Sequence, residues 1–74
     1  MVHADIRKME KKMIDADFWY KKGYYELVQK NHMSLAINCF KEALSTYLRH
    51  YPAMFNLACC YEREGKLSYA IKWL

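Results

Sequence analysis

Residues 31–40, NHMSLAINCF, and residues 65–74, GKLSYAIKWL, contain the pattern that decides the expected fold. Aligned without gaps, the two stretches pair a turn residue, a small residue and a large apolar residue in the same order. The matched pairs are Asn31 with Gly65, Ser34 with Ser68, Ala36 with Ala70, Ile37 with Ile71, and Phe40 with Leu74. Each pair is 34 residues apart. A constant offset of this size indicates an internal structural repeat.

The residues around these stretches favour helices that alternate with turns. Apolar residues recur at helical spacing through most of the chain. Asn31 and Gly65 suit the left-handed conformation that closes a helix, and Ser34 suits the start of the next one. Pro52 suits the first turn of another helix, where its missing N–H is not needed. The sequence therefore predicts an all-α fold of paired helices.

A 34-residue period of paired helices resembles the tetratricopeptide repeat, a helix–turn–helix unit of protein-binding solenoids. The family pattern is W-x2-L-G-x2-Y, a turn Gly, A-x3-F, and then Ala and Pro. The matching residues here are Ala36, Phe40 and Ala43 in a first unit, and Leu57, Ala58, Tyr61, Gly65, Ala70 and Leu74 in a second. The resemblance implies a right-handed α-solenoid with unit one at 17–50, a truncated unit two at 51–74, and a leading helix or extension at 1–16.

The first helix of unit one departs from the family pattern. The large–small order is inverted at Gly23-Tyr24. Either Gly23 takes the close contact between helices, or this helix is rotated slightly. Ile6, Met9 and Met13 share one face of residues 3–14, which predicts a leading helix, separate from or continuous with the helix beginning near Asp15. We expect that face to cover the apolar side of unit one.

The repeat pattern also predicts the core. Ala36 and Ala70 allow two helix backbones to approach each other closely. Large apolar side chains fill the space around that contact, and burying each one contributes about 1.5–3 kcal/mol. The expected members are Ile37, Phe40, Leu44, Leu57, Tyr61 and Ile71. Trp19, Tyr20, Tyr69 and Trp73 are expected to pack rather than to stack on bases.

The resemblance implies a peptide-binding groove lined by the first helix of each unit. Unit one would contribute Phe18, Lys21, Lys22, Tyr25 and Gln29, and unit two Phe55, Asn56, Cys59 and Arg63. Aromatic side chains with scattered cations suit an extended or helical segment that has apolar anchors and some acidity. Alternatively, these residues face solvent or a neighbouring repeat. Tyr20 and Tyr24 replace the residues with which one family subtype grips chaperone tails, so that ligand is not expected.

The predicted function is therefore protein–protein interaction, as a scaffold or adaptor segment that binds a partner peptide or a neighbouring subunit. The chain has 12 Lys and Arg against 8 Asp and Glu, a formal charge of +4. These charges are interspersed, which is typical of a solvated helix face rather than a nucleic-acid site. A basic module that contacts nucleic acid is one alternative. A structural subunit of a larger assembly, docking by its ends, is another.

No motif predicts catalysis, a cofactor or a metal site, so the chain is not expected to be an enzyme. The three Cys form no CxxC pair, and Cys59 and Cys60 cannot point the same way on a helix. His3, His32 and His50 lack the spacing of a metal site and are expected at the surface. Free thiols and the absence of an apolar run of about 18 residues predict an intracellular, cytoplasmic chain without a membrane span.

The C-terminal stretch lacks the polar capping helix that usually closes a solenoid. We therefore expect either a fragment of a longer solenoid or an exposed end that a partner covers, in a homo-oligomer or a larger complex.

Overall fold

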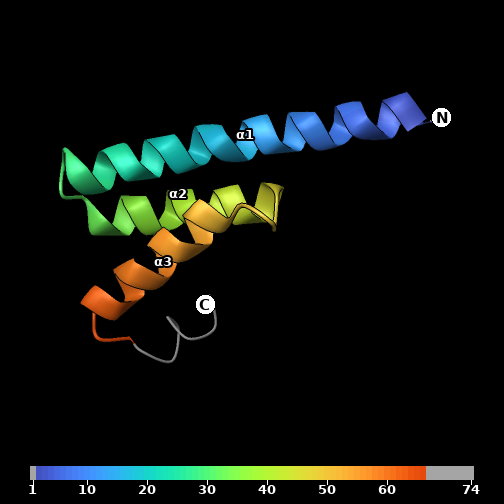
Figure 1. Ribbon diagram of the computed structural model, residues 1–74. Helices are drawn as coiled ribbons and strands as arrows, with labels where there is room; N and C mark the ends of the chain where they lie inside the picture. The colour runs from blue at the N-terminus through green and yellow to red at the C-terminus, as the bar shows by residue number, and fades with distance from the viewer. Residues whose placement is uncertain (1, 67–74) are drawn as a thin grey trace.

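The computed structural model describes residues 2–66, with side chains from Arg7 onward (Figure 1). Three helices make up most of this part: α1 (Val2–Val28), α2 (Met33–Thr46) and α3 (Tyr51–Arg63). Residues 2–66 contain no strand, so the predicted all-α class is confirmed. The predictions for the second half of unit two lie outside the described residues; they concern Ser68, Tyr69, Ala70, Ile71, Trp73 and Leu74.

The turn between α1 and α2 forms at Asn31, as predicted. Asn31 has φ 56°, the left-handed conformation that ends a helix. The N–H of His32 then donates to the carbonyl of Glu26 at 2.9 Å. His32 is the N-cap of α2, and its carbonyl accepts from the N–H of Ala36 at 3.0 Å. Ser34 therefore lies in the first turn, at the start of α2 as predicted, but the N-cap is His32 rather than Ser34.

The end of α3 repeats this backbone conformation at the matching position. Gly65 has φ 75°, and the N–H of Lys66 donates to the carbonyl of Tyr61 at 2.8 Å. Pro52 lies in the first turn of α3, as expected from its missing N–H. Left-handed residues thus end a helix at both punctuation points identified from the sequence.

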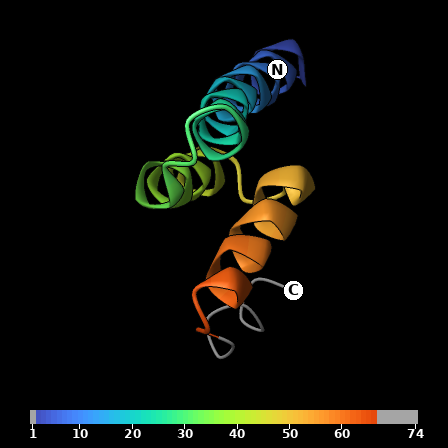
Figure 2. The same ribbon diagram turned by 90° about the vertical axis from the view of Figure 1, so that its left-hand side faces the viewer.

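The core lies where α2 packs against both α1 and α3 (Figure 2). The predicted core residues within the described part are all buried: Ile37, Phe40, Leu44, Leu57 and Tyr61. Alanines allow the close approach of the helices, and all those between Arg7 and Lys66 are buried: Ala16, Ala36, Ala43, Ala53 and Ala58. Trp19 and Tyr20 are partly buried against this cluster, as predicted.

Gly23 explains the inverted order in the first helix. A Cβ at this position would lie 2.8 Å from Cε1 of Phe40 and 3.0 Å from Cβ of Cys39. Gly23 therefore takes the close contact between α1 and α2, which is the first of the two alternatives above. Tyr24 is half exposed, and its ring lies 6.1 Å from that of Tyr20 between centroids.

The leading segment is continuous with the rest of α1, and the helix runs past the end of α2 (Figure 1). Met9 and Met13 remain about half exposed, because no helix of the described part lies opposite them beyond Thr46. The face of α1 that carries Met9 and Met13 therefore covers the α1–α2 unit only in part.

Candidate functional site

Seven positions of α1 form a continuous strip on its exposed side, which we call the α1 stripe. They are Arg7, Lys11, Ile14, Phe18, Lys21, Tyr25 and Val28. Their spacing alternates between four and three residues, so they follow one face of the helix. The opposite side of α1, with Ala16 and Gly23, is buried against α2.

The apolar members of the α1 stripe are open to solvent. The exposed fractions are 69% for Ile14, 62% for Phe18, 51% for Tyr25 and 54% for Val28. The ring of Phe18 makes an edge contact with Trp19, at 5.6 Å between centroids. Side chains of this size seldom gather on one exposed face unless the face binds something.

A shallow cavity of about 340 Å³ lies along the C-terminal half of the stripe. Its lining consists of Tyr20, Lys21, Tyr24, Tyr25, Val28 and Gln29. Three of the predicted groove residues, Lys21, Tyr25 and Gln29, are therefore brought together here. Tyr20, Tyr24 and Val28 were missed, although Val28 continues the three–four spacing and could have been found by it.

Lys22 does not belong to this surface. Its Nζ lies 5.3 Å from the centroid of the Trp19 ring, and both residues line a cavity together with Cys39 and Glu42 of α2. A cation over an indole face is attracted by the ring, which holds Lys22 away from the stripe.

The four predicted residues of α3 do not join the α1 residues in this cavity. Asn56 reaches α1, where its Nδ2 donates to the Tyr20 hydroxyl at 3.4 Å and also to the Pro52 carbonyl at 2.8 Å. Phe55 and Arg63 are exposed, and Cys59 is half buried. Because α3 turns away from α1 along its length, the nine residues do not line one groove (Figure 2).

His50 makes the polar connection that fixes the start of α3. The prediction of a surface His is wrong here, since His50 is only 8% exposed. Its Nδ1 accepts from the Ala53 N–H at 3.2 Å, and its Nε2 lies 2.8 Å from Asp17 Oδ1. Because Nδ1 accepts, the proton is on Nε2, which donates to the Asp17 carboxylate. His32 is exposed as predicted and contacts Glu26 at 2.9 Å, while the His3 side chain lies outside the described part.

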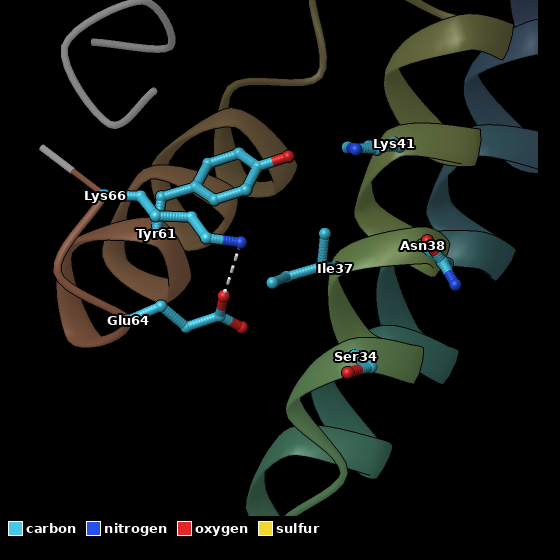
Figure 3. A pocket seen from close by; sticks show the side chains of 7 residues that line it. All are labelled: Ser34, Ile37, Asn38, Lys41, Tyr61, Glu64 and Lys66. Atoms are coloured by element: carbon cyan, nitrogen blue, oxygen red, sulfur yellow. Dashed lines mark ion pairs between the residues drawn. The ribbon is translucent and has the colours of Figure 1, made fainter. Parts of the chain in front are cut away.

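A second cleft of about 390 Å³ opens between α2 and α3 (Figure 3). Ile37 points into it from α2, opposite Tyr61 of α3. The charges at its rim are paired or stacked: Lys66 Nζ lies 3.1 Å from Glu64 Oε2, and Lys41 Nζ lies 5.7 Å from the Tyr61 ring. The charged side chains around this cleft therefore already interact with other residues of the chain, so few of them are left to attract a charged ligand.

All three cysteines are free thiols. Burial raises the pKa of Cys39 and of Cys60 above the ordinary value of 9.0; nearby Lys22 and Arg63, respectively, oppose the shift less strongly. Both thiols are therefore protonated at neutral pH, and neither is an activated nucleophile. Among residues 7–66, no group of three His, Cys, Asp or Glu side chains is arranged to hold a metal ion.

No helix within the described residues is both long enough and apolar enough to span a membrane. Comparisons with protein-family models, with curated proteins and with solved structures found no match to this chain.

Proposed function

We propose that the chain is a protein–protein interaction module, and that the α1 stripe is the surface by which it holds its partner. The observation that carries this proposal is the row of exposed apolar side chains at Ile14, Phe18, Tyr25 and Val28. Aromatic anchors on a rigid helix lose little conformational entropy on binding, and such residues dominate the energy of many interfaces.

We further propose that α1 and α2 form one unit of a tetratricopeptide-like solenoid, and that α3 begins the next. The support is the 34-residue offset between the left-handed residues Asn31 and Gly65 and the close contact at Gly23. In such an arrangement the first helix of each unit presents its outer face to a partner. The binding surface proposed here is confined to α1, because α3 diverges from it.

Site-directed photo-crosslinking tests this proposal. A photo-crosslinking amino acid replaces Phe18 in one variant and Leu48 in another; both side chains are more than 60% exposed, but they lie on different surfaces. After irradiation in extracts of the cells that produce the chain, we expect discrete protein adducts from position 18 alone. Excess unlabelled wild-type chain should suppress them, whereas excess Phe18→Ser/Tyr25→Ser chain should not.

Two results would count against the proposal. Identical adducts from positions 18 and 48 would show that the α1 stripe has no special role. Adducts that disappear after nuclease treatment would indicate a nucleic-acid-contacting module instead. Circular dichroism spectra that match wild type would establish that each variant is folded.

A further inference from the structure

We infer that the α1 stripe receives an acidic amphipathic helix of a partner protein, laid lengthwise along α1. This inference rests on the proposed function and specifies the chemistry of the partner. It follows from the spacing of the stripe, from the charges within it and from the length of α1.

The spacing points to a helical partner. From Arg7 to Val28 the seven positions alternate four and three residues apart without interruption. This is the repeat by which two helices interlock side chains along a shared seam. An extended peptide matches a sheet edge or a row of pockets and does not require a seven-residue period.

The length of the surface sets the length of the partner helix. The stripe covers 22 residues of a single uninterrupted helix, with 21 residue steps from Arg7 to Val28. At a rise of about 1.5 Å per residue, this corresponds to about 32 Å, or about three heptads. The N-terminal third of the stripe lies where α1 extends past α2, so a helix can approach it without meeting another element of the described part (Figure 1).

The charges select an acidic partner. Arg7, Lys11 and Lys21 occupy seam positions, are exposed, and form no ion pair with any of the described residues. Three acidic residues border the stripe, Glu10, Asp15 and Asp17, and Asp17 already contacts His50 at 2.8 Å. Lys8 and Lys22 border it as well, so the basic groups in and beside the stripe outnumber the acidic ones. Carboxylates on the partner would neutralise these cations, and Lys21 in the middle of the seam would fix the register, as a polar seam residue does in coiled coils.

The same charges disfavour two other occupants. A parallel second copy of the stripe would bring like charges together along the seam, and an antiparallel copy would place Lys21 opposite the apolar side chain of Ile14. A membrane-bound helix places its cations at the border of an uninterrupted apolar face, whereas Lys21 stands between Phe18 and Tyr25 in the row itself. The observations therefore favour an acidic helix over either alternative.

A binding assay with defined peptides tests the inference. The probe is a dye-labelled, 21-residue synthetic peptide with Leu at two positions of each heptad and Glu beside them. Repulsion between its Glu side chains keeps it monomeric at neutral pH. A counterpart replaces every Glu with Lys. Fluorescence anisotropy gives the Kd of each peptide for the full chain, and vesicles of phosphatidylcholine and phosphatidylglycerol form the third arm.

We expect the acidic peptide to bind at least about tenfold more tightly than the basic one, with no comparable retention on vesicles. Lys21→Glu should weaken binding of the acidic peptide about tenfold, and Phe18→Ser/Tyr25→Ser should weaken it at least as much. Lys12→Glu is the matched control, because Lys12 is exposed on the same helix but outside the stripe. It should change the Kd less than about twofold.

Equal binding of the two peptides, no binding of either, or equal effects of Lys21→Glu and Lys12→Glu would each overturn the inference. Binding to vesicles in place of the peptide would assign the stripe to a membrane surface. If any of these results came with specific protein adducts from position 18, the proposed function would stand and only the acidic helix would be excluded. Loss of both signals would reject both claims.

Discussion

Gly23 lies in a space between α1 and α2 that is too small for a methyl group. An added Cβ would meet the fully buried Phe40 ring at 2.8 Å and Cys39 Cβ at 3.0 Å. Because the ring is enclosed, it cannot swing away, and the two helices would have to separate. Close packing against α2 therefore requires a glycine here, although a glycine in the middle of a helix makes that helix less stable than an alanine would.

We predict that Gly23→Ala lowers the free energy of unfolding by about 1–2 kcal/mol, since overpacking outweighs the gain of about 0.5–1 kcal/mol in helix propensity. Urea unfolding followed by circular dichroism measures the change. The double variant Gly23→Ala/Phe40→Leu should lose less than the sum of the two single variants. A stabilised Gly23→Ala variant would contradict the close contact.

The buried thiols make stability depend on alkaline pH. Burial raises the pKa of Cys39 and of Cys60 in the folded chain. In the unfolded chain the same thiols ionise near their ordinary value of 9.0. The unfolded state therefore binds fewer protons above that pH, and folding loses stability as the pH rises further.

We predict a smaller decline of the unfolding free energy between pH 8 and 10 for Cys39→Ala and for Cys60→Ala than for wild type. Cys59→Ala is the control, because Cys59 is only half buried. We compare the slope of the unfolding free energy against pH in each protein. The cavity left by each truncation shifts the free energy by the same amount at every pH, and the titration of Tyr and Lys is common to all variants, so neither changes the difference between slopes. Identical slopes in all four proteins would refute this explanation.

At the scale of the elements, the helix ends were the most predictable feature of the sequence. Asn31, Gly65 and Pro52 act through backbone conformation, which each residue type determines locally. The start of α2 was less predictable, because His32 serves as N-cap through its backbone while its ring contacts Glu26. The position of the N-cap of α2 therefore goes with a contact between His32 and Glu26 of α1, which the local sequence does not reveal.

The left-handed turn at Asn31 carries a prediction of its own. Asn31→Gly should preserve or slightly raise stability, whereas Asn31→Val should lower it by about 1–2 kcal/mol, since a β-branched residue at φ 56° is strained. Lys30→Val, next to it and also exposed, is the control and should change stability by less than about 0.5 kcal/mol. Urea unfolding measures all three. Equal losses at positions 30 and 31 would rule out the turn as the cause.

The candidate site was predicted in part. The exposed face of α1 follows from helical spacing, and Phe18, Lys21, Tyr25 and Gln29 are all exposed on that helix. Lys22 could not be assigned in this way, because its position depends on the Trp19 ring beside it.

In the molecule as a whole, the direction of α3 relative to α1 could not be predicted from the sequence. The predicted groove requires α1 and α3 to run side by side, and a repeat period does not specify the angle between successive helices. The angle instead depends on tertiary contacts, among them the buried His50 with its bond to Asp17.

His50→Ala should therefore do more than remove one cap. We expect a loss of about 1–2 kcal/mol from the missing acceptor for the Ala53 N–H, and a change in how α3 sits against α1. His50→Asn keeps a capping acceptor and should recover most of the stability but not the bond to Asp17. Nuclear Overhauser contacts between the Tyr20 and residue 56 side chains report the placement of α3. Unchanged contacts in His50→Ala would show that other packing fixes α3.

The α1 stripe is proposed here as a docking surface for an acidic helix. Amide and methyl chemical shifts of the labelled chain, followed while the acidic heptad peptide is added, test it most directly without altering the protein. We expect the largest shift changes at Ile14, Phe18, Lys21, Tyr25 and Val28, while Leu48 and the α2–α3 cleft around Ile37 stay unchanged. Changes concentrated in that cleft, or no changes at saturating peptide, would contradict this proposal.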